Sequence, residues 1–596
     1  MLQGKVVSQR PRAKTQDRES LTAAWQEIPW TKVHRHVFRL QKRIYQATQR
    51  GDVRTVRQLQ NLLSKSWYAR LLAIRRVTQD NRGRHTAGID GVKSLHPPQR
   101  LRLANELTLD DTATPLRRIW IPKRGTPEQR PLGVPTLHER ARQTVVRQAL
   151  EPEWEAKLSA HFYGFRPGRS CWDAIAAVFH RIKFRPQYIL KVDISKCFDR
   201  IDHTALLAKL QAPPGIRRQV RGWLRSGILE ADTLSPTTAG TPQGGSVSPL
   251  LALMALHGIE EAITHVYPEA RVIAYADDCL VLHPDRAVLE HSQQLLNEWL
   301  AGIGLTLNTS KTRMSHTLAG DQPGIDFLGF HIRQYRVGKH QSGKGPRGVQ
   351  RLGYKTLITP AKANVKAHLA ELGRIIRQGQ DWPQAALIRK LNPNIRGWAN
   401  YYRTWVSQAT FSRLDHLIWV KLRRWAYRRH SHTSATWIHN RYWQRRDSRE
   451  GFATPMTPNG QVRLINHNET PSLFHAKVSG NRSPYDGDWV YWSRHRGHYP
   501  TVKTRVATLL KKQNGRCAYC GQYFQHADQL EVDHINGDRR NSRYNNLQAL
   551  HGHCHDAKTR EHKEYLPVGM RDKHQHTEER RDRKRSCSVL KQRLAV

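Results

Sequence analysis

Two short apolar runs on either side of a pair of aspartates constrain this chain more than any other stretch. Residues 272–274 and 279–282 are apolar, and Tyr275-Ala276-Asp277-Asp278 lies between them. Apolar runs around a polar break predict two antiparallel strands joined by a tight turn. Adjacent carboxylates at the turn repel each other, so a fold that keeps both ionised usually places a cation there. Taken alone, the motif also fits a solvated turn, where Asp is common.

A second strand with an aspartate near its end supplies the missing context. Residues 188–194 read Tyr-Ile-Leu-Lys-Val-Asp-Ile and contain Asp193. Three aspartates on neighbouring strands can hold two metal ions, the arrangement used for phosphoryl and nucleotidyl transfer. Magnesium prefers oxygen ligands and binds through one or two carboxylates plus substrate phosphates. We therefore predict a Mg²⁺ site formed by Asp193, Asp277 and Asp278.

Length and charge narrow the class of protein. The chain has 596 residues, too many for one core, so several domains are expected. Its 98 Lys and Arg against 49 Asp and Glu give a formal charge of +49, which favours a nucleic-acid partner. A membrane surface is the weaker alternative, because the basic residues are spread over the whole length. No apolar run approaches the ~20 residues of a membrane span, and no signal peptide is evident, so an intracellular, cytoplasmic protein is expected.

Several stretches before Asp193 indicate contacts with nucleic acid or nucleotide. Residues 30–77 show helical periodicity among many basic residues and predict two amphipathic helices, either simply solvated or in contact with RNA. Residues 117–123 and 130–133 predict a β-hairpin in which Lys123 and Arg130 grip a triphosphate, unless these side chains are merely solvated. Residues 162–170 form an aromatic and basic turn suited to a nucleic-acid backbone.

The residues after Asp193 continue this pattern. Phe198 is either a core residue or an aromatic that lies under the sugar of an incoming nucleotide and clashes with a 2′-hydroxyl. Residues 240–249 are rich in Gly, which lets backbone approach a ligand, and Ser248-Pro249 marks a helix start. A helix over 289–300 and a strand over 327–330 are expected further on.

The order of these blocks resembles the reverse transcriptases encoded by mobile group II introns. The matching pieces are Gly88-Ile89-Asp90-Gly91, Arg130-Pro131-Leu132-Gly133, Tyr163-Gly164-Phe165-Arg166-Pro167-Gly168, Asp193 with Phe198-Asp199, Thr241-Pro242-Gln243-Gly244-Gly245, Tyr275-Ala276-Asp277-Asp278 and Phe327-Leu328-Gly329-Phe330. The resemblance covers roughly residues 50–340 and rests on the order of the blocks. It implies a right-hand polymerase with fingers and palm, magnesium on the three aspartates, Phe198 as selector of the deoxy sugar, and Gln243 near the incoming nucleotide.

Two downstream segments extend the resemblance. Residues 391–403 resemble the family's thumb, or maturase, segment. Apolar residues at 414, 417, 418, 422 and 425 predict one helical face, and basic residues on the other faces offer a cationic surface to RNA. In this family that surface helps the intron RNA fold for splicing. The family has a DNA-binding segment next, which is placed over residues 446–505 by position only.

Four residues near the C-terminal end have the spacing of a zinc site. Cys517 and Cys520 form one Cys-x₂-Cys pair, and His551 with Cys554 forms a second pair at the same spacing. Such a set predicts a closed tetrahedral structural zinc site. Within the family the second pair is often two cysteines, so His551 as fourth ligand is an inference and His553 is its rival.

The residues between and beside these pairs resemble an HNH nuclease with a ββα-metal fold. Asp533-His534, Asn546 and His555 occur in that order. The resemblance implies that His534 is the general base, that Asp533 and His555 hold one divalent ion, Mg²⁺ or similar, and that Asn546 orients the loop carrying His534. The alternative is a zinc module that binds DNA without cutting it.

The sequence thus predicts an α+β multidomain protein: a right-hand polymerase, an α-helical thumb and a small zinc-containing HNH domain. The expected parts are a basic extension (1–50), fingers and palm (51–345), thumb or maturase domain (346–445), DNA-binding segment (446–505), HNH domain (506–570) and charged tail (571–596). It would bind its intron RNA as a ribonucleoprotein, assist splicing, nick target DNA and copy the RNA with deoxynucleoside triphosphates. The alternatives are an RNA-binding splicing cofactor with idle catalytic sites, and a reverse transcriptase of a defence or diversity-generating system.

Overall fold

A four-stranded antiparallel sheet in the order β6-β7-β3-β8 lies at the centre of the computed structural model. Its strands are β3 (Tyr188–Asp193), β6 (Arg271–Tyr275), β7 (Asp278–His283) and β8 (Arg313–His316). The structure describes residues 22–122, 128–241, 243–446, 449–457, 460–500, 502–526 and 528–564. The predicted hairpin around residue 277 is confirmed, because β6 pairs antiparallel with β7.

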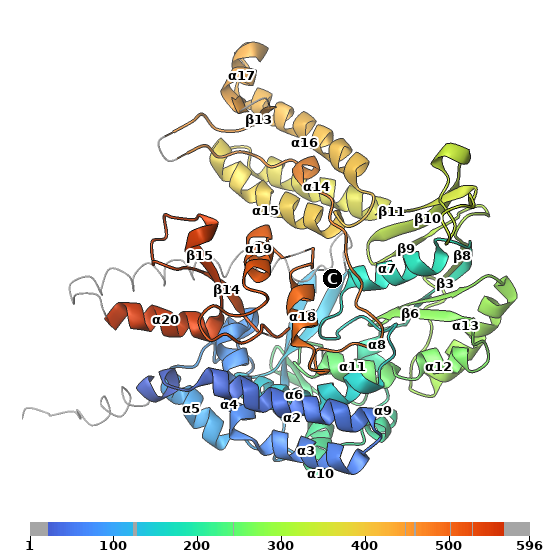
Figure 1. The fold of residues 1–596 in the computed structure, drawn as a ribbon, viewed down its shortest axis with the longest axis vertical. Helices are drawn as coiled ribbons and strands as arrows, with labels where there is room; N and C mark the ends of the chain where they lie inside the picture. Colours follow the sequence, from blue (N-terminus) through green and yellow to red (C-terminus); the bar gives the residue numbers. More distant parts are fainter. Residues whose placement is uncertain are drawn as a thin grey trace, which may run out of the picture.

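Both faces of this sheet are buried. Along β3, Leu190 and Val192 enter one core cluster and Ile189 enters the other, as alternate residues of a strand must. The first cluster includes residues of α11 (Ser248–Leu256), α12 (Ile259–Thr264) and α13 (Arg286–Ala301), and the second includes residues of α7 (Cys171–Ile182). Figure 1 shows α7 on one side of the sheet and α11 and α12 on the other. Double burial explains why these strands read as nearly continuous apolar runs.

The N-terminal part is helical, and the prediction of two helices there was wrong. Residues 30–77 form α2 (Trp30–Gln49), α3 (Val53–Lys65) and α4 (Trp67–Arg75), followed by a π-helix from Arg76 to Asp80. Asp52 starts α3 by accepting a hydrogen bond from the Thr55 amide, and the extended backbone of Ser66 separates α3 from α4. All three helices pack on α6 (Leu137–Lys157), so the helices on either side of residue 50 share one core.

A second sheet has the strand order β2-β1-β4-β5. It consists of β1 (Leu116–Pro122), β2 (Gln129–Val134), β4 (Ile228–Glu230) and β5 (Thr233–Ser235). The predicted hairpin is confirmed in its two strands, which pair antiparallel with Ile121 opposite Arg130. Lys123 lies outside the described residues, and so does Pro242 of the glycine-rich loop.

The strand expected over residues 327–330 is in fact a turn. β9 (Ile325–Phe327) ends just before the turn and β10 (Phe330–Arg336) begins just after it, and the two strands pair antiparallel. Leu328 and Gly329 connect them with φ of 47° and 79°, a left-handed conformation that a strand does not contain. β11 (Tyr354–Pro360) completes this three-stranded sheet on the other side of β10.

Four helices form a separate layer near the top of Figure 1: α14 (Lys362–Gln378), α15 (Gln384–Tyr402), α16 (Gln408–Arg429) and α17 (Ala435–Tyr442). The helical face predicted around residue 418 is largely buried: Leu414, Ile418, Leu422 and Trp425 are inside. Leu417 is only half-buried. A short hairpin, β12 (Trp443–Arg446) and β13 (Arg449–Phe452), follows.

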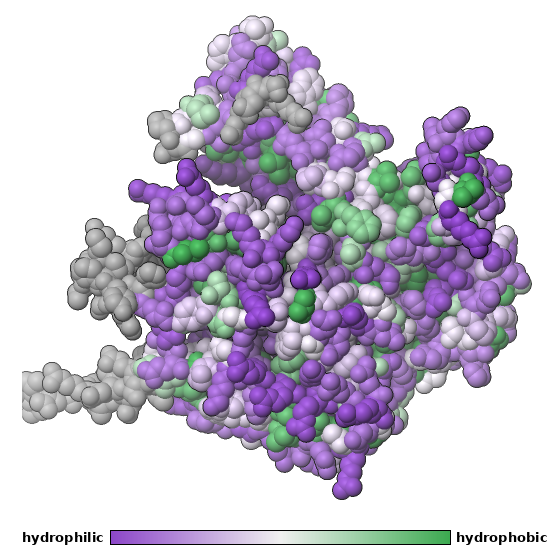
Figure 2. Space-filling view, viewed as in Figure 1, coloured by the Kyte–Doolittle hydropathy of each residue, from purple (hydrophilic) through white to green (hydrophobic). Residues whose placement is uncertain are grey.

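The C-terminal part returns to the N-terminal helices. α18 (Trp489–Arg496) and α19 (Thr504–Lys512) precede β14 (Leu530–His534), the antiparallel β15 (Leu547–His551) and α20 (Gly552–Glu564). Figure 1 shows this ββα unit next to α19, which precedes it in the sequence, and next to α2 and α4 from the other end of the chain. Among the described helices, none combines the length and apolar composition that crossing a bilayer requires. Hydrophilic residues cover most of the face seen in Figure 2. The predicted segments 1–20 and 571–596 lie outside the described residues.

Candidate functional site

The structure brings the three predicted aspartates to one end of the central sheet. Asp193 ends β3 and lies directly opposite Asp278, the first residue of β7. Opposed residues of antiparallel strands have Cβ atoms about 4.5–5.5 Å apart. Asp277 lies in the turn that precedes Asp278, where Ala276 has φ of 57°. The tight hairpin therefore presents both of its carboxylates beside Asp193.

Crowding of these carboxylates favours a bound cation. Asp277 is exposed, and Asp193 and Asp278 are half-buried. Partial desolvation at the turn raises the pKa of Asp277 and Asp278, and repulsion from Asp193 adds to both shifts. Lys191 and Lys311 oppose the shift at Asp278, and Lys311 Nζ lies 4.0 Å from Asp193 Oδ2. The sequence reasoning missed both lysines, although Lys191 precedes Asp193 by two residues and so shares its face of β3. An all-carboxylate donor set in this environment fits magnesium.

A glycine fixes the position of the hairpin turn that carries Asp277. Tyr163 donates its amide to the Ala274 carbonyl at 2.8 Å, and the Ala274 amide donates to the His161 carbonyl at 3.0 Å. These bonds press Gly164 against the turn so closely that a Cβ there would lie 2.2 Å from the Ala276 nitrogen and 2.7 Å from the Tyr275 carbonyl carbon. Only glycine leaves the Tyr275–Ala276 peptide in place.

We expect Gly164→Ala to slow RNA-templated primer extension by about 10²-fold, because a displacement near 1 Å at reacting groups costs that much. The added methyl must push the peptide that carries Asp277. Gly215→Ala is the matched control, since a Cβ at Gly215 meets nothing within 4 Å. Equal extension rates for the two variants would show that the turn tolerates the displacement.

Three predicted nucleotide-binding residues lie within the described part of the chain. Phe198, in α8 (Cys197–Arg200), is half-buried and meets Phe165 edge-on at 5.8 Å between ring centroids. Gln243 donates from Nε2 to Asp199 Oδ1 at 3.0 Å, a partner that the sequence reasoning missed. Arg130 is exposed on β2. Its positive charge partly offsets the rise in the pKa of Asp277, so the Arg130 guanidinium is near enough to act on that carboxylate.

The glycines of residues 240–245 approach the chain's own backbone. A Cβ at Gly240 would lie 2.6 Å from the Phe198 carbonyl oxygen, and one at Gly244 would lie 2.5 Å from that of Gly133. The Thr241 amide also donates to the Phe198 carbonyl at 2.6 Å. This loop therefore connects α8 to β2. It fixes the positions of Phe198, Gln243 and Arg130 relative to one another.

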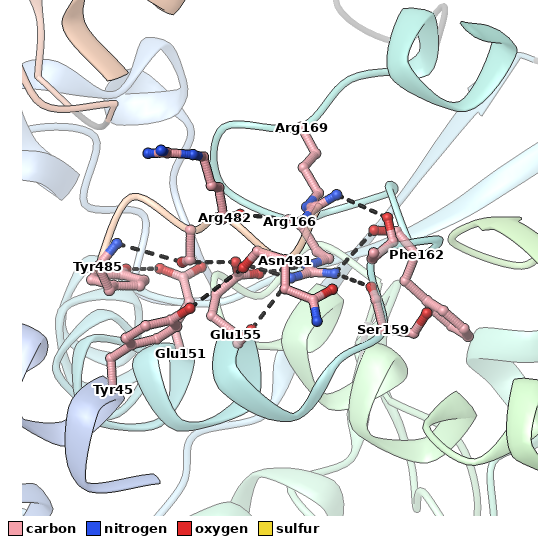
Figure 3. A network of polar contacts seen from close by, with 12 residues as sticks. Tyr45, Glu151, Glu155, Ser159, Phe162, Arg166, Arg169, Asn481, Arg482 and Tyr485 are labelled. Carbon is pink, nitrogen blue, oxygen red and sulfur yellow. Dashed lines mark hydrogen bonds and ion pairs between the residues drawn. The ribbon is translucent and has the colours of Figure 1, made fainter. Parts of the chain in front are cut away.

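The aromatic and basic turn of residues 162–170 is mostly internal, so its predicted contact with a nucleic-acid backbone was wrong for its arginines. Arg166 is 4% exposed and Arg169 is 7% exposed. Arg166 Nε donates to Glu155 Oε1 at 2.7 Å, and its Nη1 donates to the Ser159 and Phe162 carbonyls (Figure 3). Of the aromatic residues here, Phe165 is exposed.

Residues 475–485 pack on the polymerase core through the same network. Arg169 donates to the Gly480 and Arg482 carbonyls, and Ser483 donates to Glu155 at 3.0 Å. Tyr485 donates to Glu151 at 2.6 Å, and Figure 3 shows these groups converging from both parts of the chain. Part of the segment predicted by position to bind DNA thus completes the core.

The predicted zinc ligands form a compact cluster. Ligand atoms of Cys517, Cys520, His551 and Cys554 all lie within 4.8 Å of one another, and in the described part of the chain this is the sole such group of three or more. His551 Nδ1 faces the sulfurs, 3.4 Å from Cys520 Sγ. His553 instead stacks on the His551 ring at 5.0 Å. Three sulfurs and one imidazole nitrogen suit zinc.

Two of the predicted nuclease residues, Asp533 and His555, meet between β14 and α20. His555, in the first turns of α20, places Nε2 3.6 Å from Asp533 Oδ1 and Nδ1 2.7 Å from Glu531 Oε2. Glu531 raises the pKa of His555 by this contact. Burial works against ionisation of Asp533, yet hydrogen bonds from Lys558 and Gln548 hold its pKa below the usual value. Glu531 and Lys558 were missed, although strand alternation places Glu531 and Asp533 on one face.

Asn546 fastens the loop that follows His534. Its Oδ1 accepts from the Asn536 amide at 3.2 Å, and its Nδ2 donates to the Asn541 carbonyl at 2.9 Å. Lys558 Nζ donates to the carbonyl of His534 itself at 2.9 Å. The His534 Nε2 is buried without a hydrogen-bond partner. Asp533 and His555 have the chemistry to hold a divalent ion, and an imidazole with a free nitrogen, such as that of His534, can accept a proton from water.

Four protein-family models match successive parts of the chain. They are the N-terminal domain of reverse transcriptase (residues 25–107), reverse transcriptase, or RNA-dependent DNA polymerase (121–332), the group II intron maturase-specific domain (365–443) and HNH endonuclease (517–561). The aspartates lie within the second match, and the cysteine cluster lies within the fourth.

Individual relatives match parts of the chain. The chain is 32% identical over 189 residues to the group II intron-encoded protein LtrA of Lactococcus lactis subsp. cremoris, a match that covers 31% of each chain. It is 26% identical to protein YkfC of Escherichia coli (strain K12), over 48% of this chain and 85% of that one. Maturase-like protein 1 of Euglena gracilis is 27% identical, over 64% and 77%.

Proposed function

This chain belongs to the group II intron-encoded proteins that join a reverse transcriptase, a maturase domain and a C-terminal HNH endonuclease, and from this we propose which residues perform each activity. The polymerase site is formed by Asp193, Asp277 and Asp278. The observation that carries this assignment is the strand register that sets Asp193 opposite Asp278 beside the Asp277 turn. RNA-templated primer extension with and without added Mg²⁺ tests it, because extension should require both the ion and the intact carboxylates.

Each residue around the turn has a distinct role in the polymerase. Bound magnesium would lower the pKa of the primer 3′-hydroxyl and stabilise charge on the leaving pyrophosphate. Arg130, near Asp277, binds the triphosphate through two guanidinium N–H groups. Lys123, on the same hairpin, contributes a point charge. Phe198 excludes a 2′-hydroxyl under the sugar. Gln243, held by Asp199, lies against the incoming nucleotide.

The sheets and helices correspond to a right hand. The β6-β7-β3-β8 sheet is the palm, the β2-β1-β4-β5 sheet with α2–α5 is the fingers, and α14–α17 form the thumb. The intron RNA binds along the exposed side of α16. Arg423 lies there within 5.6 Å of the exposed Trp419 ring, a pairing that suits stacking on unpaired bases.

The HNH domain cuts the target DNA strand that primes synthesis. His534 removes a proton from water, Asp533 and His555 hold the divalent ion, and Asn546 keeps the His534 loop in place. Cys517, Cys520, His551 and Cys554 would hold a zinc ion, which would tie the end of β15 to the start of α20 and so fix His555. The protein would thus act as a ribonucleoprotein with its intron RNA, nick DNA and extend the nick with deoxynucleoside triphosphates.

We expect His534→Ala to lower DNA nicking by about 10²–10⁴-fold, the usual contribution of a general base. Primer extension should be unchanged, because His534 lies in the HNH domain and the aspartates lie in the polymerase. Nicking of a labelled duplex and extension of an annealed primer measure the two activities separately. Asp277→Ala is the reciprocal control, which should nick at the normal rate. Normal nicking by His534→Ala would assign the base elsewhere.

A further inference from the structure

The zinc cluster has a second side that faces the polymerase. His551 turns Nδ1 towards the cysteines and Nε2 towards Asp528, whose Oδ2 lies 3.2 Å away. The other oxygen of Asp528, Oδ1, lies 3.4 Å from Nδ1 of His34 on α2. The Asp528 side chain is 3% exposed and that of His34 is 11% exposed. One buried carboxylate thus joins a zinc ligand to the first long helix of the polymerase.

This arrangement has the chemistry of a ligand support. A histidine that binds zinc through one nitrogen almost always gives the other N–H to a carboxylate, which fixes the ring and makes it a better ligand. A buried carboxylate in turn needs partners, because an unpaired buried charge costs several kcal/mol. Asp528 finds them in both domains: Oδ2 faces His551 and accepts from the Gln525 amide at 2.6 Å, and Oδ1 faces His34.

Further contacts tie the same two surfaces together. The His553 ring lies between the other two imidazoles, with centroids 4.9 Å from His34 and 5.0 Å from His551. Arg75 of α4 reaches Asp556 of α20 at 2.9 Å while it covers the Trp30 ring at 4.7 Å. Asp556 directly follows His555, so the contact extends to the nuclease residues.

We propose that the zinc cluster also docks the nuclease onto the polymerase, with Asp528 shared between zinc ligand His551 and His34. His34 is then a positioning residue for a metal site that lies more than 480 positions later in the chain. The proposal rests on the proposed zinc site. It predicts that the polymerase helices slow the loss of zinc. It also predicts that removal of zinc releases α20 and β15 from α2 and α4, and Figure 1 shows α20 beside these two helices.

Zinc release from the full-length protein tests this directly. The purified protein is mixed with a chromogenic chelator, and release is followed for the parent, His34→Ala and His36→Ala. His36 is the matched control, because it lies on the same helix but its ring contacts Tyr68 at a tilt, with centroids 4.8 Å apart. Alanine favours helix, so α2 should persist in both variants. We expect zinc release to be about 10–100-fold faster from His34→Ala and unchanged from His36→Ala. This is the usual size of the effect when a group that supports a metal ligand is lost.

Hydrogen exchange supplies a second readout. Chelation of zinc from the parent should raise amide exchange along residues 30–49 and 67–75, and His34→Ala should show raised exchange at residues 547–556 before chelation. A parent protein that carries no zinc would overturn the proposed zinc site itself. A zinc-loaded parent whose His34→Ala variant releases zinc no faster than His36→Ala, or whose α2 is indifferent to chelation, would overturn the docking alone.

Discussion

Replacing Asp277 with Ala should lower RNA-templated primer extension by about 10³-fold or more. A metal site of this kind contributes several kcal/mol of transition-state stabilisation, and each 1.36 kcal/mol is about tenfold in rate. Asp277 is one of two carboxylates on the hairpin turn, so its removal takes away charge that the ion needs. Steady-state incorporation of one deoxynucleotide on an annealed RNA template gives the rate.

The control for this variant is another aspartate in a neighbouring sheet. Asp326 lies on β9, is exposed, and pairs with His331 at 2.6 Å. Asp326→Ala removes the same charge from the chain without touching the hairpin, so it should extend primers at close to the parental rate. If both variants extended equally well, Asp277 would not bind the catalytic ion, and the polymerase site would have to lie elsewhere.

The largest effect on stability is expected at Arg166. Its side chain and that of Glu155 are 1% and 2% exposed, and they meet at 2.7 Å. Breaking a buried pair by removing one partner costs about 3–5 kcal/mol, because the other charge stays buried without compensation. Arg166→Met also leaves the Ser159 and Phe162 carbonyls without this donor. We expect the polymerase core to unfold at clearly lower urea, as followed by proteolysis of residues 137–200.

Arg218→Met provides the comparison. Arg218 pairs with Asp111 at an identical 2.7 Å, but the two side chains are 59% and 43% exposed. Exposed pairs contribute about 0–1 kcal/mol, so this variant should unfold at nearly the parental urea concentration. Similar shifts for both variants would mean that water reaches the Glu155 carboxylate and that the network in Figure 3 is looser than its burial indicates.

The central hairpin was predictable because its signal is local. Apolar runs on both sides of Asp277 require strands, and the two covered faces of the sheet account for their composition. The turn at residues 328–329 was missed because a short apolar run contains no direct sign of positive φ, and Gly329 was the one available clue. The third helix in residues 30–77 was hidden because Ser66 interrupts the periodicity without Gly or Pro.

Arg166 and Arg169 show why contacts between distant segments of the chain could not be predicted. Basic residues in a loop of a chain with charge +49 are expected to face solvent or nucleic acid. Their partners are Glu155, on the preceding helix, and carbonyls of residues 480 and 482, more than 300 positions away. No local pattern announces contacts at that separation. The same holds for Asp528, whose partner His34 comes from the other end of the described chain.

The long reach of Tyr485 to Glu151, 334 positions apart, has a consequence for synthesis on the ribosome. At about 5–20 residues per second, roughly 20–70 s separate the emergence of the two residues. Throughout that interval the nascent α6 carries Glu151 and Glu155 without their late partners Tyr485 and Ser483. A ribosome that stalls before codon 485 therefore leaves these two carboxylates, and the Phe38 and Tyr45 side chains that pack with Tyr485, without their late partners.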